Sequence, residues 1–272
     1  MSEARAPALA LERVTCTFPA ADRTAAAYTA VHEVSLQVAP GEFVCLVGPT
    51  GCGKSTLLNV AAGLLAPSAG IVRVAGEPLR GLNRRAGYLF QAEALLPWRS
   101  ARENVAAGLQ FRGMERRHAL QRADEWLGRV GLTGFGHHYP HQLSGGMRKR
   151  VALAQTLILD PAIVLMDEPF SALDVQTRQL MENELLDLWS ADRKSVVFIT
   201  HDLEEAISLS DRVVVLSAGP ATRAIGEFVI DLARPRDVAE VRLTRRFLEL
   251  HREIWELLKA EVLKGHAQSQ RA

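Results

Sequence analysis

Residues 43–55 read Phe-Val-Cys-Leu-Val-Gly-Pro-Thr-Gly-Cys-Gly-Lys-Ser, and they decide the fold. The first five form a continuous apolar run, which is typical of a strand buried on both faces. The other eight satisfy the pattern G-x-x-x-x-G-K-[ST], and residues 54–65 carry the periodicity of a helix. A glycine-rich loop between a buried strand and a helix is the context in which this pattern binds phosphate. The sequence therefore predicts a phosphate-binding loop in an α/β fold.

Each part of this loop has a physical role in holding phosphate. The glycines let successive backbone N–H groups turn inward as an anion nest, and the helix N-terminus adds partial positive charge. We expect Lys54 to reach the β- and γ-phosphates of ATP and Ser55 to offer its hydroxyl to Mg²⁺. Cys52 is expected to face outward. The residues expected to surround the nucleotide are Gly48, Pro49, Thr50, Gly51, Cys52, Gly53, Lys54, Ser55 and Thr56.

A second apolar run, residues 163–166, ends in Asp167 and Glu168. A buried strand that ends in acids places carboxylates at the carboxyl edge of the sheet, where ligands bind in open α/β folds. We expect Asp167 to hold Mg²⁺ through water and Glu168 to orient the water that attacks the γ-phosphate. Kinases of small molecules often lack the second acid, so Glu168 favours hydrolysis over transfer to a substrate.

Strand and helix patterns alternate along the rest of the chain, which favours a mostly parallel α/β core. Residues 91–136 are helical and charged, as an inserted helical segment would be. An alanine-rich stretch, residues 20–30, is expected to be a loop. The predicted strands are 31–38, 43–47, 86–90, 163–166, 196–199 and 213–216. The predicted helices are 54–65, 147–159, 175–189 and 241–263.

The composition is that of a globular protein with little net charge. Its 32 basic and 31 acidic residues give a net charge of +1, which does not favour a protein that coats a polyanion. No apolar run approaches the roughly 18–20 residues that span a bilayer, and residues 1–19 lack the apolar centre of a secretory signal. The three cysteines, Cys16, Cys45 and Cys52, lack metal-ligand spacing and are expected to be reduced thiols.

The stretch Leu143-Ser144-Gly145-Gly146-Met147 resembles the signature sequence of ATP-binding-cassette (ABC) ATPases, and the other motifs of that family appear in the family's order. The resemblance covers roughly residues 9–218. In this family an aromatic ring stacks on adenine, and Phe18 and Tyr28 are the two candidates for it. The matching positions are Phe18 for that aromatic residue, Gln91 for the Q-loop, Ser171-Ala172-Leu173-Asp174 for the D-loop and His201 for the switch histidine.

The resemblance implies a phosphate-loop NTPase core with a mostly parallel sheet, an N-terminal antiparallel β subdomain and an inserted helical subdomain. It implies an ATPase domain over residues 1–232, with the helical subdomain at about 92–160, and a C-terminal helical extension over residues 233–272. ATP and Mg²⁺ are the implied substrate and cofactor.

Roles for single residues also follow from the resemblance. The implied catalytic residues are Glu168, His201 and Gln91. The implied magnesium ligands are Ser55, Gln91 and Asp167. The signature residues would reach the γ-phosphate of ATP held by a second copy, so that two copies close head to tail. These signature residues are Ser144, Gly145 and Gly146.

A narrower resemblance is to the nitrate/sulfonate/taurine branch of bacterial import ATPases. It rests on four features: Leu95-Leu96-Pro97-Trp98, Tyr139-Pro140-His141-Gln142, Met147 in place of glutamine, and Asp231-Leu232-Ala233-Arg234-Pro235-Arg236. Gln155 departs from the family, where arginine is common. The branch implies transport of a small anion such as a sulfonate, taurine or nitrate. Residues 95–98 are the candidate docking surface, expected to be exposed.

Partners and location follow from the same branch. It implies integral-membrane permease subunits, a second ATPase copy and, indirectly, a periplasmic or lipid-anchored substrate-binding protein, but no nucleic acid. It also implies a peripheral position on the cytoplasmic face of the inner membrane. The transported molecule, the identity of the two ATPase copies and the role of the C-terminal helix stay open.

Two other functions share part of this pattern. DNA-repair and chromosome-organising ATPases have a similar head but carry long coiled coils, and no heptad run lies between the phosphate loop and the signature. A soluble phosphate-loop kinase would need neither the signature serine nor a dimer. A metal site at His137, His138 and His141 is less favoured than a solvated loop.

Overall fold

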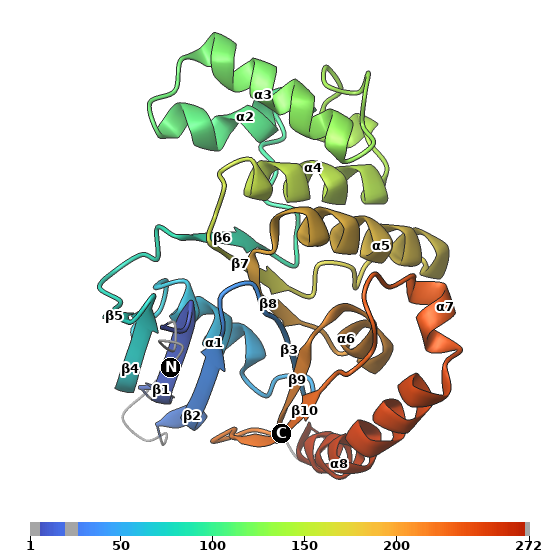
Figure 1. The fold of residues 1–272 in the computed structure, drawn as a ribbon. Coiled ribbons are helices and arrows are strands. Elements are labelled where there is room, and N and C mark those ends of the chain that lie inside the picture. The colour runs from blue at the N-terminus through green and yellow to red at the C-terminus, as the bar shows by residue number, and fades with distance from the viewer. Residues whose placement is uncertain (1–5, 20–26, 270–272) are drawn as a thin grey trace, which may run out of the picture.

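The computed structural model describes residues 6–19 and 27–269, with side chains described as far as residue 265. These residues form two sheets, the larger at the middle of the fold and the smaller at one side of it (Figure 1). Among the described residues, the larger sheet has six strands in the order β10-β9-β3-β8-β7-β6 and the smaller has four in the order β2-β1-β4-β5. The larger sheet contains β3 (Phe43–Val47), β6 (Ala86–Leu89), β7 (Ile163–Asp167), β8 (Ser195–Ile199), β9 (Arg212–Leu216) and β10 (Ala224–Val229). The smaller contains β1 (Leu9–Phe18), β2 (Tyr28–Val38), β4 (Ala69–Val74) and β5 (Glu77–Pro78).

The larger sheet is parallel from β9 to β6, and its edge strand β10 is antiparallel. Every residue of β3 and β8 is buried, which explains why both are continuous apolar runs. Because parallel neighbours run in one direction, the carboxyl ends of β3, β6, β7 and β8 meet at one edge of the sheet. Helix α1 (Lys54–Ala61) starts at this edge. The predicted α/β fold with a mostly parallel sheet is confirmed.

The smaller sheet is antiparallel and contains the N-terminal strands. β1 pairs with β2 from Leu9 opposite Val38 to Phe18 opposite Tyr28, with several register shifts in between. β2 starts earlier in the chain than the predicted strand. The prediction of one loop over residues 20–30 is therefore wrong for the last three residues, which belong to β2, and residues 20–26 lie outside the described part.

Three helices form a layer above the larger sheet (Figure 1) and are α2 (Ala101–Phe111), α3 (Arg116–Arg129) and α4 (Gly145–Leu157). α2 begins with a capping box, in which Ser100 and Glu103 each accept a hydrogen bond from the other's backbone N–H group. The apolar faces of the three helices form their own cluster, with Val105 and Val151 fully buried. Residues 91–100 are not helical, contrary to the prediction. The limits of a separate helical subdomain stay a prediction.

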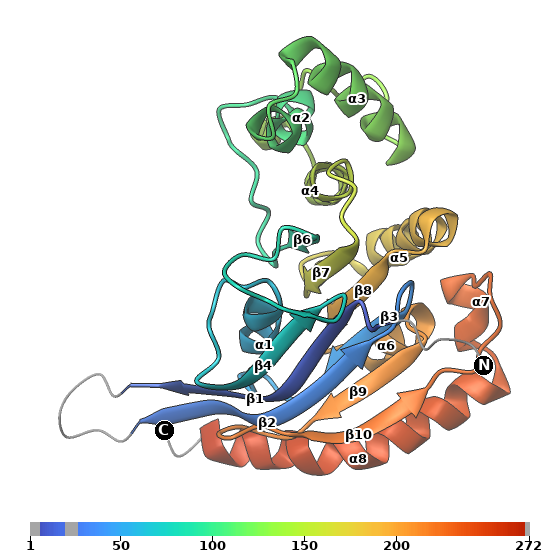
Figure 2. The same ribbon diagram turned by 60° about the vertical axis from the view of Figure 1, so that its left-hand side comes forward.

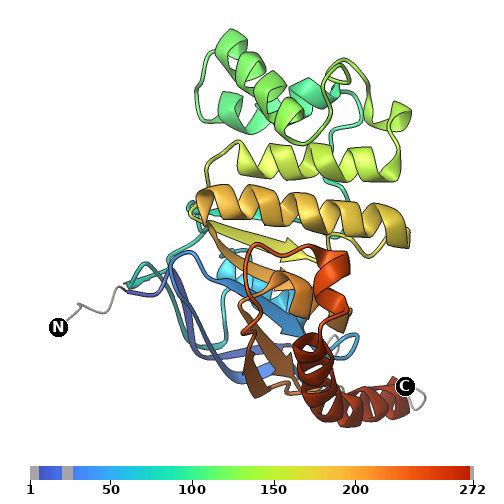
Figure 3. The same cartoon turned by 45° about the vertical axis from the view of Figure 1, so that its right-hand side comes forward.

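Two further helices cover the larger sheet: α5 (Val175–Asp192) and α6 (Leu203–Leu209). Figure 3 shows α4 and α5 running side by side above the strands, with α5 next to the sheet. Met181, Leu185 and Trp189 of α5 pack in the same cluster as Phe43 of β3 and Phe198 of β8. This cluster fixes α5 against the strands that carry the predicted site residues.

The C-terminal part contains two helices where the sequence predicted one. α7 (Val238–Arg242) and α8 (Arg245–Ser269) are separated at Leu243 and Thr244, so the predicted helix 241–263 starts in the wrong place. Thr244 provides the reason, because its hydroxyl accepts from the Phe247 N–H at 3.3 Å and caps α8. α8 lies along β9 and β10 (Figure 2). Its side chains in the main core are Phe247, Leu250, Ile254 and Leu258. Within the described residues, no helix is both long and apolar enough to cross a membrane.

Candidate functional site

The predicted phosphate loop, residues 48–53, leaves the carboxyl end of β3 and enters α1. Gly51 and Gly53 have φ angles of 75° and 95°, in the left-handed region that favours glycine. Lys54 is buried, and its ammonium donates to the carbonyl oxygens of the first two loop residues at 2.9 Å and 3.0 Å. The loop therefore wraps around a cation at a helix N-terminus, which is the arrangement of an anion site.

Ser55 and Asp167 meet at the edge of the sheet. The Ser55 hydroxyl donates to Asp167 Oδ1 at 3.1 Å, which joins α1 to the end of β7. Burial raises the pKa of Asp167, the hydrogen bond from Ser55 opposes this rise, and the nearby Glu168 charge adds to it. Mg²⁺ prefers oxygen ligands, and a hydroxyl beside a carboxylate supplies two of them. The two side chains therefore fit the predicted magnesium ion.

Glu168 lies between two other predicted residues. Its Oε2 atom accepts from Gln91 Nε2 at 3.2 Å and lies 3.3 Å from His201 Nδ1. Gln91, Glu168 and His201 follow β6, β7 and β8, which are neighbours in the sheet. Parallel pairing therefore gathers three side chains that are far apart in the sequence around one carboxylate.

The backbone of Glu168 is unusual for a residue with a side chain. Its φ of 44° lies in the left-handed region, which costs about 1–2 kcal/mol. The Glu168 N–H donates to the Ile199 carbonyl oxygen at 3.0 Å, and this bond holds the turn against β8. Strained backbone that is held by its surroundings is common at functional sites. The strain supports a functional role for this carboxylate.

Three side chains that hold the His201 turn are not among the predicted site residues. The Thr200 hydroxyl donates to Glu205 Oε2 at 2.5 Å and accepts from the Asp202 N–H at 3.0 Å. Asp202 caps α6, and Glu205 is 3% exposed. An aspartate followed by acids is a helix-start signal, but α6 has only seven residues, too few for a clear apolar period.

The signature residues lie apart from the Glu168 cluster. Ser144 is exposed and caps α4, where its hydroxyl accepts from the Met147 N–H at 3.2 Å. α4 lies on the other side of β6 and β7 from α1 (Figure 2). A Cβ atom at Gly146 would lie 2.8 Å from Thr177 Cγ2, so the close approach of α5 gives this glycine a structural reason as well. Within one chain, the signature and the phosphate loop are separate surfaces.

The two aromatic candidates for contact with adenine lie opposite each other. Phe18 ends β1 and pairs with Tyr28 at the start of β2. The exposed fractions of the two residues are 38% and 49%. Residues directly opposite on an antiparallel pair point to the same face, so either ring can present itself to one ligand.

One expectation about exposure is wrong and a second is wrong in part. Cys52 is 1% exposed instead of facing outward, and burial raises the pKa of its thiol. Its side chain packs into the buried cluster that contains Val44, Leu46 and Leu57. In the segment Leu95-Leu96-Pro97-Trp98 the two leucines are half-buried, and only the last two residues are exposed. The first leucine packs against two hydrophobic clusters.

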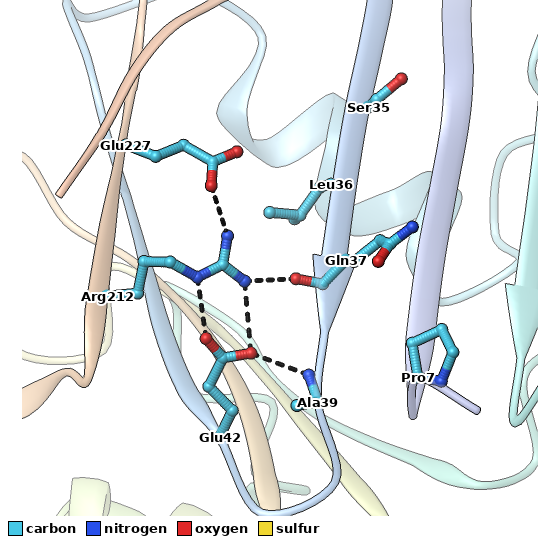
Figure 4. Close-up of a pocket in the computed structure, with 8 residues that line it drawn as sticks. All are labelled: Pro7, Ser35, Leu36, Gln37, Ala39, Glu42, Arg212 and Glu227. Carbon is cyan, nitrogen blue, oxygen red and sulfur yellow. Dashed lines mark hydrogen bonds and ion pairs between the residues drawn. The ribbon is translucent and has the colours of Figure 1, made fainter. Parts of the chain in front are cut away.

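A separate cavity of about 480 Å³ lies beside β2 and β9 (Figure 4). The guanidinium group of Arg212 donates to Glu42 at 2.8 Å, to Glu227 at 2.7 Å and to the Gln37 carbonyl oxygen. These partners take up most of its donors, so the cavity offers little to an anion. Because Arg212 belongs to β9 and Gln37 to β2, we interpret this group as a link between the two sheets.

Comparison with known proteins agrees with this geometry. Residues 31–171 match the family model described as ABC transporter. The chain is 48% identical over 237 residues to an uncharacterized ABC transporter ATP-binding protein of Methanocaldococcus jannaschii, covering 87% of this chain and 86% of that protein. It is 48% identical over 191 residues to the taurine import ATP-binding protein TauB of Yersinia pestis, covering 70% and 75%. It is 42% identical to the nitrate import ATP-binding protein NrtD of Synechococcus elongatus, covering 85% of each.

A solved structure has the same fold. It is the dimeric, post-hydrolysis state of the ATP-binding cassette MJ0796 bound to ADP and inorganic phosphate. The TM-score is 0.73 at 33% identity, and the match covers 83% of this chain and 100% of that chain.

Proposed function

Because this chain belongs to the ABC transporter family as an ATP-binding subunit with ATPase activity, we propose that it drives uptake of a small anion such as a sulfonate, taurine or nitrate. The observation that carries the catalytic part is the Glu168 carboxylate. It bonds to Gln91 and lies against His201, next to the Ser55–Asp167 pair. A phosphate cradle, metal ligands and a base for water are the parts that ATP hydrolysis requires.

We propose the following roles for these side chains. The loop N–H groups and Lys54 bind the β- and γ-phosphates of ATP. Ser55, Asp167 and Gln91 would hold Mg²⁺, which when bound neutralises negative charge on the phosphates. Glu168 accepts a hydrogen bond from the attacking water and takes its proton as the water oxygen bonds to the γ-phosphorus. The bond from that phosphorus to the bridging oxygen of ADP breaks in the same step, so ADP and inorganic phosphate are the products. Gln91 and His201 hold the Glu168 carboxylate in place, and His201 donates to the γ-phosphate.

The active site is proposed to be shared between two copies of the chain. Ser144, Gly145 and Gly146 form an exposed or half-exposed N-terminus of α4, an element separate from the phosphate loop between β3 and α1. A helix N-terminus of this kind favours a phosphate group. In a head-to-tail pair, each signature would meet the γ-phosphate bound to the other copy. ATP binding would then close the pair, and loss of the γ-phosphate would open it.

We propose that permease subunits dock in a groove between the sheet and the helical layer, which would hold the chain at the cytoplasmic face of the inner membrane. The groove is a cavity of about 730 Å³. Phe111 and Leu82 line it and are 77% and 62% exposed, which supports a protein partner because exposed apolar patches mark interaction sites. Phe90 also lines it and directly precedes Gln91, so an occupant would act next to the catalytic cluster.

Purified protein with Glu168→Gln tests the catalytic assignment. We expect ATP hydrolysis to fall at least about 100-fold while ATP binding is retained, because the amide cannot take a proton from water. Asp187→Asn, which changes an exposed acid on α5, is the matched control and should keep wild-type turnover. Unchanged hydrolysis in Glu168→Gln would overturn the assignment.

Uptake measurements test the proposed cargo. Cells that carry the wild-type chain with its membrane partners are compared with cells that carry Glu168→Gln. We expect the variant to lose uptake of one of three labelled anions: taurine, an alkanesulfonate or nitrate. Equal uptake of all three in both cell types would refute the cargo class and leave the ATPase assignment untouched.

A further inference from the structure

We propose that Lys149 is a positioning residue that ties the signature helix α4 to the catalytic cluster through the backbone of Gln91. This inference rests on the proposed function, because it connects the two half-sites of the proposed dimer. The observation behind it is one hydrogen bond. The Lys149 ammonium donates to the Gln91 carbonyl oxygen at 2.5 Å, between residues 58 positions apart.

The setting of Lys149 shows that this bond holds the side chain firmly. Lys149 is 3% exposed, although lysine is almost never fully buried without a partner. Burial lowers its pKa, and the charge of Glu93 opposes that shift. A buried ammonium without a partner is costly, so the contact to the Gln91 carbonyl is strongly favoured.

The neighbouring residue, Arg148, does not make the same contact. Its Nε atom lies 3.5 Å from Glu93, and it donates to the Leu143 carbonyl oxygen at 2.8 Å. Two adjacent cations of α4 therefore reach the segment that follows β6, but the contact to the Gln91 backbone belongs to Lys149. Because Arg148 also holds the backbone of the signature residue Leu143, the next cation of the helix, Arg150, is the better control.

A continuous set of contacts now joins both half-sites. The side chain of Gln91 donates to Glu168 at 3.2 Å, and the backbone carbonyl oxygen of Gln91 accepts from Lys149. Lys149 lies on the same rigid helix as the cap residue Ser144. When Ser144 engages ATP on the second copy, a shift of α4 would move the Gln91 backbone and with it the partner of Glu168. The position of Gln91 beside Glu168 in one chain would thus depend on whether the signature of that chain is bound to ATP.

Lys149→Met tests this inference because it keeps a long apolar stem and removes the donor. We expect kcat to fall about 10- to 100-fold, as displacement of a catalytic group does, with KM for ATP changed less than about twofold. Any positive cooperativity between the two ATP sites should be lost. Arg150→Met removes a cation from the same helix that contacts the Val130 carbonyl oxygen and Glu184, and it should keep kcat and cooperativity.

A double-mutant cycle separates positioning from simple stabilisation. If Lys149 acts through Gln91, Lys149→Met should cost nothing more in a Gln91→Ala background, whereas a general loss of stability would add to it. Lys149→Gln, whose amide donor is one bond shorter, should lose less kcat than Lys149→Met. If thermal unfolding shows that Lys149→Met is not folded, Lys149→Gln takes its place in the cycle.

The outcomes distinguish this inference from the proposed function. Wild-type hydrolysis that does not depend on Glu168 would overturn both. Hydrolysis that depends on Glu168 but is unchanged by Lys149→Met, or costs that add in the cycle, would overturn the role of Lys149 alone.

Discussion

Glu182 is a fully buried carboxyl group on α5, and its Oε2 atom accepts from Arg242 at 3.0 Å. Burial raises its pKa to about 8, Arg242 opposes the rise, and the nearby Glu205 adds to it. The bond to Arg242 connects α5 to α7. The protonation state of Glu182 therefore affects the contact between α5 and α7.

The raised pKa of Glu182 predicts a stability that falls with rising pH. The folded-state pKa lies above the unfolded value of about 4.3, so the folded state binds more protons between the two and the free energy of unfolding decreases as pH rises through this range. Glu182→Gln removes this titration and should make the decrease shallower. Urea unfolding at about pH 5.5 and about pH 7.5 measures it. Asp187→Asn is the control and should keep the wild-type change in the free energy of unfolding between the two pH values. The same change in Glu182→Gln as in wild type would contradict the prediction.

At the scale of elements, α8 connects the core to the phosphate loop. Its first half packs in the main core, and its second half carries Glu261, whose Oε2 atom accepts from the Ala218 N–H at 2.8 Å. A Cβ atom at Gly265 would lie 3.3 Å from Pro49 Cβ, so the helix backbone itself reaches the phosphate loop. A Cβ atom at Gly219 would lie 3.7 Å from Cys52 Cα. α8 therefore contacts the phosphate loop directly at Gly265 and indirectly through the bond from Glu261 to Ala218, which precedes Gly219.

This support predicts a change in nucleotide affinity when Glu261 is replaced. Glu261→Ala removes a charge-assisted bond to Ala218, in the loop after β9 that contacts the phosphate loop. KM for ATP should therefore rise about three- to tenfold with little change in kcat. Glu256→Ala changes an exposed acid of the same helix and should leave both constants alone. Steady-state kinetics at several ATP concentrations measure the effect. A fall in kcat with constant KM would argue against a role in nucleotide binding.

Elements differ in how well the sequence predicts them, for a physical reason. β3, β7 and β8 are buried on both faces, so their continuous apolar runs are visible in the sequence. β1 was not predicted, because register shifts interrupt its alternation and Arg13 within it has a φ of 48°. The separation of α7 and α8 depends on the Thr244 cap. The amphipathic pattern of the sequence continues across Thr244, so the pattern alone does not reveal this break.

At the scale of the whole molecule, the separation of signature and phosphate loop predicts ATP-dependent pairing. In the Glu168→Gln background, in which we expect bound ATP to persist, we expect ATP to convert the protein into a dimer. Ser144→Arg should abolish the dimer, because a bulky cation would occupy the helix N-terminus that must meet phosphate, while ATP binding by each copy persists. Light scattering after size exclusion measures the mass. Ser190→Arg, on an exposed position of α5, is the control and should still dimerise.

The sequence by itself determined the parallel core and the chemistry of the phosphate loop, because buried strands and a contiguous glycine-rich motif are encoded by neighbouring residues. The residue types of the site were readable too: Gln91, Glu168 and His201 each follow a strand. Only the tertiary structure decided that these three meet at one carboxylate, that Cys52 turns inward and that Lys149 reaches the Gln91 carbonyl. Such contacts depend on strand order and helix packing, which join residues far apart in the chain and leave no periodic trace in the sequence.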